Sequence, residues 1–206
     1  MKELHRSDMY AWSRFDEARN IDFNGYLWRR PAGNVVIDPV DTSPHERARL
    51  AELGGVHTIV ITNSDHTRAA RQLLEAFPAR VLAPLAEKAT FPFACDDYVA
   101  DGDEIVPGLT ALALAGSKTP GELALWLEGR TLITGDLVRA NRAASLDCLP
   151  RAKLADTEQA LSSLVRLAEL PEVDAVLPGD GWPVFRGGQA ALRELVQRAR
   201  LAFAAA

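Results

Sequence analysis

The order of the expected helices and strands constrains the fold of this chain most strongly. Strands alternate with helices at both ends of the sequence, and a run of strands lies between them. Strands are expected at residues 20–30, 35–38, 57–62, 81–83, 109–114, 123–128, 131–134 and 174–177. Helices are expected between Ser43 and Gly54, over residues 69–77, between Asp156 and Pro171, and over residues 192–203. Because each sheet face and helix stripe must be buried against another layer, this order predicts a layered α/β protein with sheets inside and helices outside.

The length and composition are typical of a globular protein. The chain has 206 residues, of which 48% are apolar and 25% are charged. That composition allows a sizeable core. Neither a low-complexity segment nor a linker interrupts the sequence. We therefore expect one domain over residues 1–206.

The charge pattern argues against nucleic-acid and membrane partners. The net charge is -5, and the lysines and arginines form no dense stripe, whereas nucleic-acid binding needs a basic face. Residues 1–8 lack the apolar segment of a signal peptide, and no apolar run approaches the ~20 residues that span a bilayer. Cys95 and Cys148 have no CxxC spacing and are expected to be buried small hydrophobes. These features predict a cytoplasmic protein with a small-molecule partner, and they leave open whether it forms a homo-oligomer.

Three aspartates follow expected strands directly. They are Asp65, Asp136 and Asp180. Open α/β sheets gather their ligands beyond the carboxyl ends of strands. Glycine lies next to two of these acids, at Gly135 and Gly179, where it permits close backbone approach. One aspartate alone is adequately explained as a turn or helix cap, but three in matching loops favour a common site.

Four segments around these aspartates carry a family resemblance. In order, they are Thr62-Asn63-Ser64-Asp65-His66-Thr67-Arg68, Gly116-Ser117-Lys118-Thr119-Pro120-Gly121, Thr134-Gly135-Asp136 and Pro178-Gly179-Asp180-Gly181. They resemble the Thr-His-x-His-x-Asp-His, Gly-His-Thr-Pro-Gly, Thr-Gly-Asp and Pro-Gly-His-Gly motifs of the metallo-β-lactamase superfamily. The resemblance covers roughly residues 20–185 and implies an α/β fold, the four-layer αββα sandwich of that superfamily.

The residues at the family's metal positions differ from the family pattern. The three histidines of the first metal site correspond to Asn63, Asp65 and Lys118. The aspartate and two histidines of the second correspond to Thr67, Arg68 and Asp180. The bridging acid is kept as Asp136, and His66 falls on a spacer position that need not face the site. The resemblance therefore implies a degenerate site that cannot form the ordinary two-zinc centre.

Charge balance predicts how such a site is held together. Burying three aspartates without a positive partner is costly and would protonate at least one of them. Lys118, helped by Arg68 or Arg139, is the expected replacement for the metal charge. We therefore expect no bound cofactor. The alternative is one divalent ion, such as magnesium, manganese or zinc, on the three aspartates.

Three functions fit this sequence. The first is a zinc-free polar pocket that binds a small ligand without turnover. The second is a hydrolase of esters, thioesters or phosphodiesters, working through a divalent ion or through Asp65 as base with Lys118 stabilising an oxyanion. The third is a non-catalytic interaction protein. The residues expected to carry the chemistry are Asp65, His66, Lys118, Asp136 and Asp180, and those expected to line the pocket are Asn63, Arg68, Arg139 and Trp182.

Overall fold

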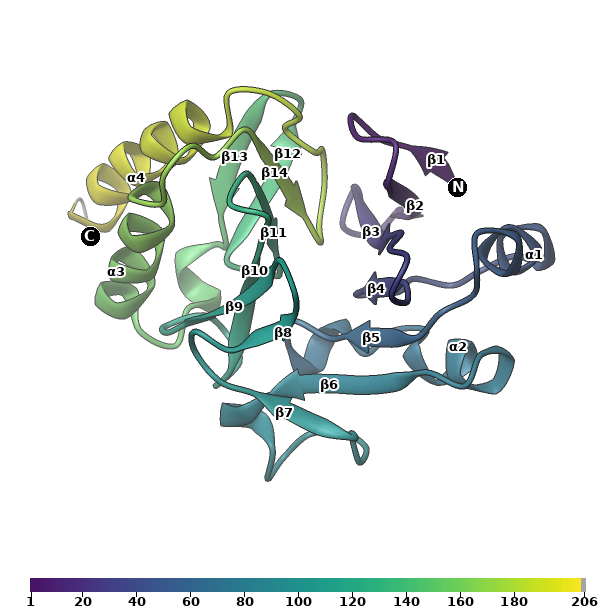
Figure 1. Cartoon of the computed structure of the whole chain (residues 1–206). Helices are drawn as coiled ribbons and strands as arrows, with labels where there is room; N and C mark the ends of the chain where they lie inside the picture. The colour runs from purple at the N-terminus through teal and green to yellow at the C-terminus, as the bar shows by residue number, and fades with distance from the viewer. Residues whose placement is uncertain (205–206) are drawn as a thin grey trace.

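Two large β-sheets face each other at the centre of the structure, a computed structural model that describes residues 1–204 (Figure 1). The first sheet has the strand order β1 (Lys2–Glu3), β2 (Met9–Asp16), β3 (Ile21–Trp28), β4 (Val35–Ile37), β5 (Thr58–Val60), β6 (Arg80–Pro84) and β7 (Asp97–Val99). The second has the order β14 (Ala175–Pro178), β11 (Thr131–Thr134), β10 (Glu122–Leu127), β9 (Leu109–Leu114) and β8 (Glu104–Val106). A separate hairpin joins β12 (Val138–Arg142) to β13 (Ser145–Cys148).

Helices cover the outer face of each sheet. Helices α1 (Pro44–Glu52) and α2 (Ala70–Ala76) lie beside the first sheet, and α3 (Thr157–Ala168) and α4 (Gly188–Ala204) lie beside the second (Figure 1). Short 3₁₀ turns are η1 (Ser64–His66), η2 (Leu85–Glu87) and η3 (Arg151–Lys153). The expected mixed α/β sandwich, with sheets inside and helices outside, is confirmed.

The layers are held by three apolar clusters. One lies between the sheets, where Tyr26 and Val60 of the first meet Leu125 of the second. A second packs α1 and α2 on the first sheet through Leu50 and Leu73. The third packs the other two helices on the second sheet. Fully burying one large apolar side chain contributes about 1.5–3 kcal/mol, so this layered burial is the main force that holds the loops of the site in register.

Local sequence signals place the helices where they were expected. Ser43 and Glu46 form a capping box, in which the Glu46 amide donates to Ser43 Oγ and the Ser43 amide donates to Glu46 Oε2. Asp156 caps α3 by accepting from the amides of Glu158 and Gln159.

Several strands were missed, and the predicted burial of the cysteines was wrong. The missed strands are β1, β2, β7, β8, β12 and β13. Charged residues interrupt most of them and obscure the alternation of apolar and polar side chains that marks a strand, although their partners lie close in sequence. Cys95 and Cys148 are half-buried free thiols. Across residues 1–204, no helix combines the length and the apolar composition needed to cross a membrane.

The fold brings three loops together at one edge of the sandwich. Strands β11 and β14 are parallel, with Thr134 opposite Pro178, so the loops that follow them leave the sheet side by side. The Gly179 amide donates to the Thr134 carbonyl at 2.7 Å. The Leu123 amide donates to the Thr62 carbonyl at 2.8 Å and ties the loop after β5, in the other sheet, to the same edge.

Candidate active site

Glycines allow these loops to approach closely. A Cβ on Gly135 would lie 2.8 Å from Thr62 Oγ1, and one on Gly179 would lie 2.7 Å from His66 Cε1. Real Cβ atoms avoid such distances, so a side chain at either position would push the loops apart. The expected reason for glycine here, close backbone approach, is confirmed.

The loop after β5 turns His66, and not Asp65, toward the other two loops. Residues 64–66 form the 3₁₀ turn η1, capped by Asn63, whose side chain accepts from the Asp65 amide at 3.0 Å. Side chains three residues apart share a face of a 3₁₀ helix. Asn63 and His66 therefore both point inward, and both are buried, whereas the Asp65 side chain is 52% exposed. The expectation that Asp65 belongs to the buried carboxylate group is wrong.

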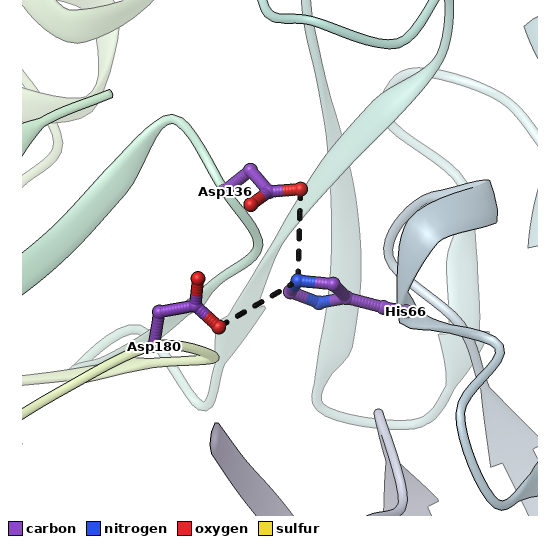
Figure 2. Close-up of side chains that lie close together, drawn as sticks. All are labelled: His66, Asp136 and Asp180. Carbon is purple, nitrogen blue, oxygen red and sulfur yellow. Dashed lines mark ion pairs between the residues drawn. The ribbon is translucent and has the colours of Figure 1, made fainter. Parts of the chain in front are cut away.

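His66, Asp136 and Asp180 form the centre of the site (Figure 2). His66 Nε2 lies 3.6 Å from Asp136 Oδ2 and 3.9 Å from Asp180 Oδ1. One ligand atom from each of the three residues lies within 4.8 Å of the others, and all three side chains are buried. Imidazole and carboxylate groups are common ligands of divalent metals.

Asp38, at the end of β4, orients the His66 ring. Its Oδ2 lies 2.7 Å from His66 Nδ1, and its carboxylate also accepts from the amide and hydroxyl of Thr62. A carboxylate on Nδ1 directs Nε2 toward the site. Burial and the Arg68 guanidinium lower the pKa of His66, but Asp38 and Asp136 outweigh them and raise it to about 9.

Two arginines neutralise Asp180. Arg68 Nη2 donates to Asp180 Oδ1 at 2.7 Å and lies 3.0 Å from His66 Nε2, and Arg139 Nη2 pairs with Asp180 Oδ2. The Arg68 backbone has a φ of 30°, a strained conformation for a residue with a side chain. The Asp180 pair and a hydrogen bond from Arg68 to the Asn24 carbonyl help hold it there.

Lys118 neutralises the other two acids. Its Nζ lies 2.6 Å from Asp65 Oδ2 and 3.1 Å from Asp136 Oδ2, so the expected salt bridges are confirmed. Asn63 adds a hydrogen bond of 3.2 Å to the same Asp136 oxygen. Burial raises the pKa of Asp136, but hydrogen bonds and charges from His66 and Lys118 hold it well below its usual range.

Two buried glutamates that the sequence did not single out support these loops. Glu87 accepts from the amides of Ser64 and Gly121 and so links two of the motif segments. Glu122 accepts from the Ser117 hydroxyl at 2.5 Å and from the Leu137 amide at 2.8 Å. Burial and the neighbouring Asp136 raise the pKa of Glu122 to about 7. Nothing in the local sequence distinguishes either glutamate from a surface residue.

The raised pKa of Glu122 predicts a specific pH dependence of stability. Between the ordinary pKa of 4.5 and about 7, the folded chain keeps this proton while the unfolded chain has lost it, so stability falls as pH rises. Glu122→Gln can keep both hydrogen bonds and cannot ionise. Relative to this variant, the wild type should lose about 2–3 kcal/mol of unfolding free energy between pH 5 and pH 8. Urea titrations across this range measure the difference, and exposed Glu169→Gln is the matched control. If the free energy of unfolding changes with pH in the same way in the wild type and in Glu122→Gln, the raised pKa of Glu122 is contradicted.

The expectation of no bound cofactor is wrong. His66, Asp136 and Asp180 supply three buried ligand atoms close enough to hold one metal ion, which is the number of protein ligands that catalytic zinc usually has. The alternative ligand set of three aspartates is also wrong, because His66 takes the place that Asp65 was expected to fill. His66 was expected among the residues that carry the chemistry, but its place beside Asp136 and Asp180 follows only from the geometry of η1.

The remaining predicted residues divide between two surfaces. Arg139 lines a pocket of about 300 Å³ beside Asp136 and Lys118. Trp182 is 56% exposed and lines a different groove, together with Met1 and Phe185. The expectation that Trp182 walls the site pocket is therefore wrong.

Comparisons with known proteins agree with the fold and the motifs. A sequence model of the metallo-beta-lactamase superfamily matches residues 1–199. Hydroxyacylglutathione hydrolase from Methylobacillus flagellatus is 30% identical over 158 residues, which cover 72% of this chain and 58% of that relative. The chain thus spans less than two thirds of that protein's length.

Solved structures show the same fold at low sequence identity. DIM-1 metallo-beta-lactamase superposes with a TM-score of 0.77 at 15% identity, covering 97% of this chain and 96% of that one. TTHA1623, solved in a di-iron-bound form, gives a TM-score of 0.68 at 24% identity, covering 87% of this chain and 96% of that one. With the family match over residues 1–199, the chain belongs to the metallo-β-lactamase superfamily.

Proposed function

We propose that this chain is a hydrolase of esters or thioesters that uses one divalent metal ion held by His66, Asp136 and Asp180. The buried group of three ligand atoms within 4.8 Å carries the proposal. The relative from Methylobacillus flagellatus is named hydroxyacylglutathione hydrolase, and this name supports acyl transfer to water as the reaction class. The donor set suits one ion and not two, because Lys118 and Arg68 stand at the family's other ligand positions.

Each side chain of the site would have a separate role in such a reaction. A divalent ion at this position would supply Lewis acidity toward the carbonyl oxygen of an ester. Asp38 holds Nδ1 of His66 and directs Nε2 toward the two carboxylates. Lys118, with a side chain 24% exposed, can donate to an oxyanion that forms in the pocket. Asp65, more exposed and paired with Lys118, can accept a proton from water.

Turnover tests this proposal directly. A panel of esters, thioesters and phosphodiesters with added zinc or manganese should show hydrolysis of an ester or thioester. Asp136→Asn should lower kcat/KM by at least ~100-fold, because it removes a ligand and the charge that pairs with Lys118. Asp147→Asn, in the hairpin outside the buried group, is the matched control. Full activity in Asp136→Asn, or activity on phosphodiesters alone, would contradict the proposal.

A second function, ligand binding without turnover, is favoured by one contact. The Arg68 guanidinium lies 3.0 Å from His66 Nε2 and 2.7 Å from Asp180 Oδ1, so a cation of the protein already satisfies two of the ligand atoms. If the chain binds a ligand without turnover, no compound of the panel is hydrolysed. A thermal-shift screen then finds ligands that stabilise the fold. A ligand at a hundredfold excess over its Kd stabilises the fold by about 2.7 kcal/mol.

A further inference from the structure

The groove that contains Trp182 is larger than the pocket beside Asp136 and is lined by other residues. Its walls come from β1, β2, β3, α1 and the loop after β14, and they include Trp12, Asp22, Glu46, Trp182 and Phe185. The three proposed metal ligands are not among the residues that line it. We call it the Trp182 groove. Its volume of about 500 Å³ lies within the range of small-molecule sites.

Aromatic rings form much of the wall of the Trp182 groove. Trp182 is 56% exposed and Phe185 is 39% exposed, whereas Trp12 is buried and its Nε1 donates to the Val40 carbonyl at 2.9 Å. The His5 ring packs against Phe185 with their centroids 5.4 Å apart. Large exposed apolar side chains that gather in one concave surface are typical of binding sites. The groove therefore offers aromatic contact area that the fold itself does not cover.

One carboxylate of the groove has no partner. Asp22 is half-buried, and its carboxylate forms neither an ion pair nor a hydrogen bond with any of residues 1–204. Glu46, the other acid of the lining, pairs with Arg14 and accepts a hydrogen bond from the Ser43 amide. Asp22 is thus the acid of the groove that can still bind a cation.

The basic residues nearby do not neutralise Asp22. Lys2 also lines the groove, but it is exposed and forms no ion pair within the described part of the chain. Partial burial and the neighbouring Arg6 lower the pKa of His5 below its usual value, so this ring is neutral at pH 7. The Asp22 carboxylate is therefore free to pair with a cation from outside the chain.

We propose that the Trp182 groove binds a small organic ammonium ion that carries an apolar group. The cation lies between the Asp22 carboxylate and the Trp182 ring, since the faces of aromatic rings attract cations. The apolar group packs against Trp12 and Phe185. This ligand is not the substrate of the proposed hydrolase. It contacts the loop after β14 from outside, where the Gly181 amide donates to the Asp22 carbonyl at 2.7 Å.

Binding of three simple probes tests this inference without any turnover. Phenethylamine, the neutral 2-phenylethanol and the anion phenylacetate are titrated calorimetrically at pH 7 into the full chain, as purified and after treatment with EDTA. The amine should bind at least tenfold more tightly than the other two probes, and equally well in both preparations. A loss of amine binding after EDTA treatment would place the amine on a metal ion and overturn the proposal.

Two variants of the groove separate the carboxylate from the ring. Asp22→Asn should weaken amine binding about tenfold and leave the alcohol unchanged, which is the scale of a hydrogen bond between charged groups. Trp182→Leu keeps an apolar contact but removes the aromatic face, so it should reduce the preference for the amine over the alcohol. An unchanged preference in both variants would refute the site.

Matched controls test the sign of the charge. Glu169→Gln removes one negative charge from an exposed residue at the end of α3 and should not change amine binding. Lys2→Met removes a like charge from the groove and should leave amine binding unchanged or make it tighter. Equal weakening by Asp22→Asn and Glu169→Gln, or a preference for phenylacetate that Lys2→Met abolishes, would overturn the proposal. Amine binding that depends on Asp22 supports it whether or not the chain hydrolyses an ester.

Discussion

Asp180→Asn should lower the free energy of unfolding by about 3–5 kcal/mol, because it leaves two largely buried guanidinium groups without their counter-charge. Asp180 is 2% exposed, while Arg68 and Arg139 are 13% and 10% exposed. Asparagine keeps the volume and one acceptor oxygen. The loss of unfolding free energy therefore measures the missing charge and not a change in packing. Urea unfolding followed by circular dichroism measures it.

Two further variants make this expectation specific. Asp65→Asn removes one ion pair whose carboxylate is 52% exposed, and it should cost less than ~1 kcal/mol. Adding Arg139→Met to Asp180→Asn should recover part of the lost stability, because one of the two unpaired cations is then gone. An Asp180→Asn variant as stable as Asp65→Asn would contradict this expectation, because the Asp180 pairs would then contribute no more than one exposed pair.

A chelator-treated preparation should bind one equivalent of zinc per chain, and His66→Gln should weaken that binding by more than ~100-fold. The imidazole is one of three buried groups that could hold the ion, and losing a ligand should exceed the 10–100-fold effect typical of a residue that only orients a ligand. Asp38→Asn belongs to that second class and should weaken binding by about 10–100-fold. Calorimetric titration measures both stoichiometry and affinity.

Substitution of Arg68 should have the opposite effect on zinc affinity. Its guanidinium lies against His66 Nε2 and Asp180 Oδ1 and competes with a metal ion for both atoms. Arg68→Ala should therefore tighten zinc binding. His45→Gln, an exposed histidine on α1, is the matched control for His66→Gln. Two equivalents of zinc in the wild type, or unchanged affinity in His66→Gln, would refute the single site.

These predictions concern a site in which the protein's own cations share the carboxylates that would hold a metal. Lys118 lies on the side of Asp65 and Asp136, and Arg68 and Arg139 lie on the side of Asp180. A metal ion must displace these cationic side chains or bind beside their positive charges. The relative affinity of the carboxylates for the metal ion and for these side chains therefore separates the hydrolase from a protein that binds a ligand without turnover. Zinc affinity and turnover in the same set of variants separate the two.

Local sequence patterns predicted most of the layered fold. The capping residues Ser43 and Asp156 begin α1 and α3, and β-branched or leucine-rich runs mark β5, β9 and β10. These signals lie within a few residues of one another, so the sequence displays them directly. Strands such as β2 and β12 were not evident, because charged side chains interrupt their apolar residues, although their partners β3 and β13 follow directly in the sequence.

The sequence by itself determined which loops meet and how their charge is balanced. Strand order and the four motif segments brought Lys118, Asp136 and Asp180 together, and the need to neutralise buried acids identified their cationic partners. Only the tertiary structure decided that His66 points inward while Asp65 points outward, and that Glu87 and Glu122 support the loops. The physical reason is that a side chain's direction depends on the exact turn of its backbone. In the 3₁₀ turn η1 each residue rotates the side chain by about a third of a turn, and the linear spacing of a motif does not carry that rotation.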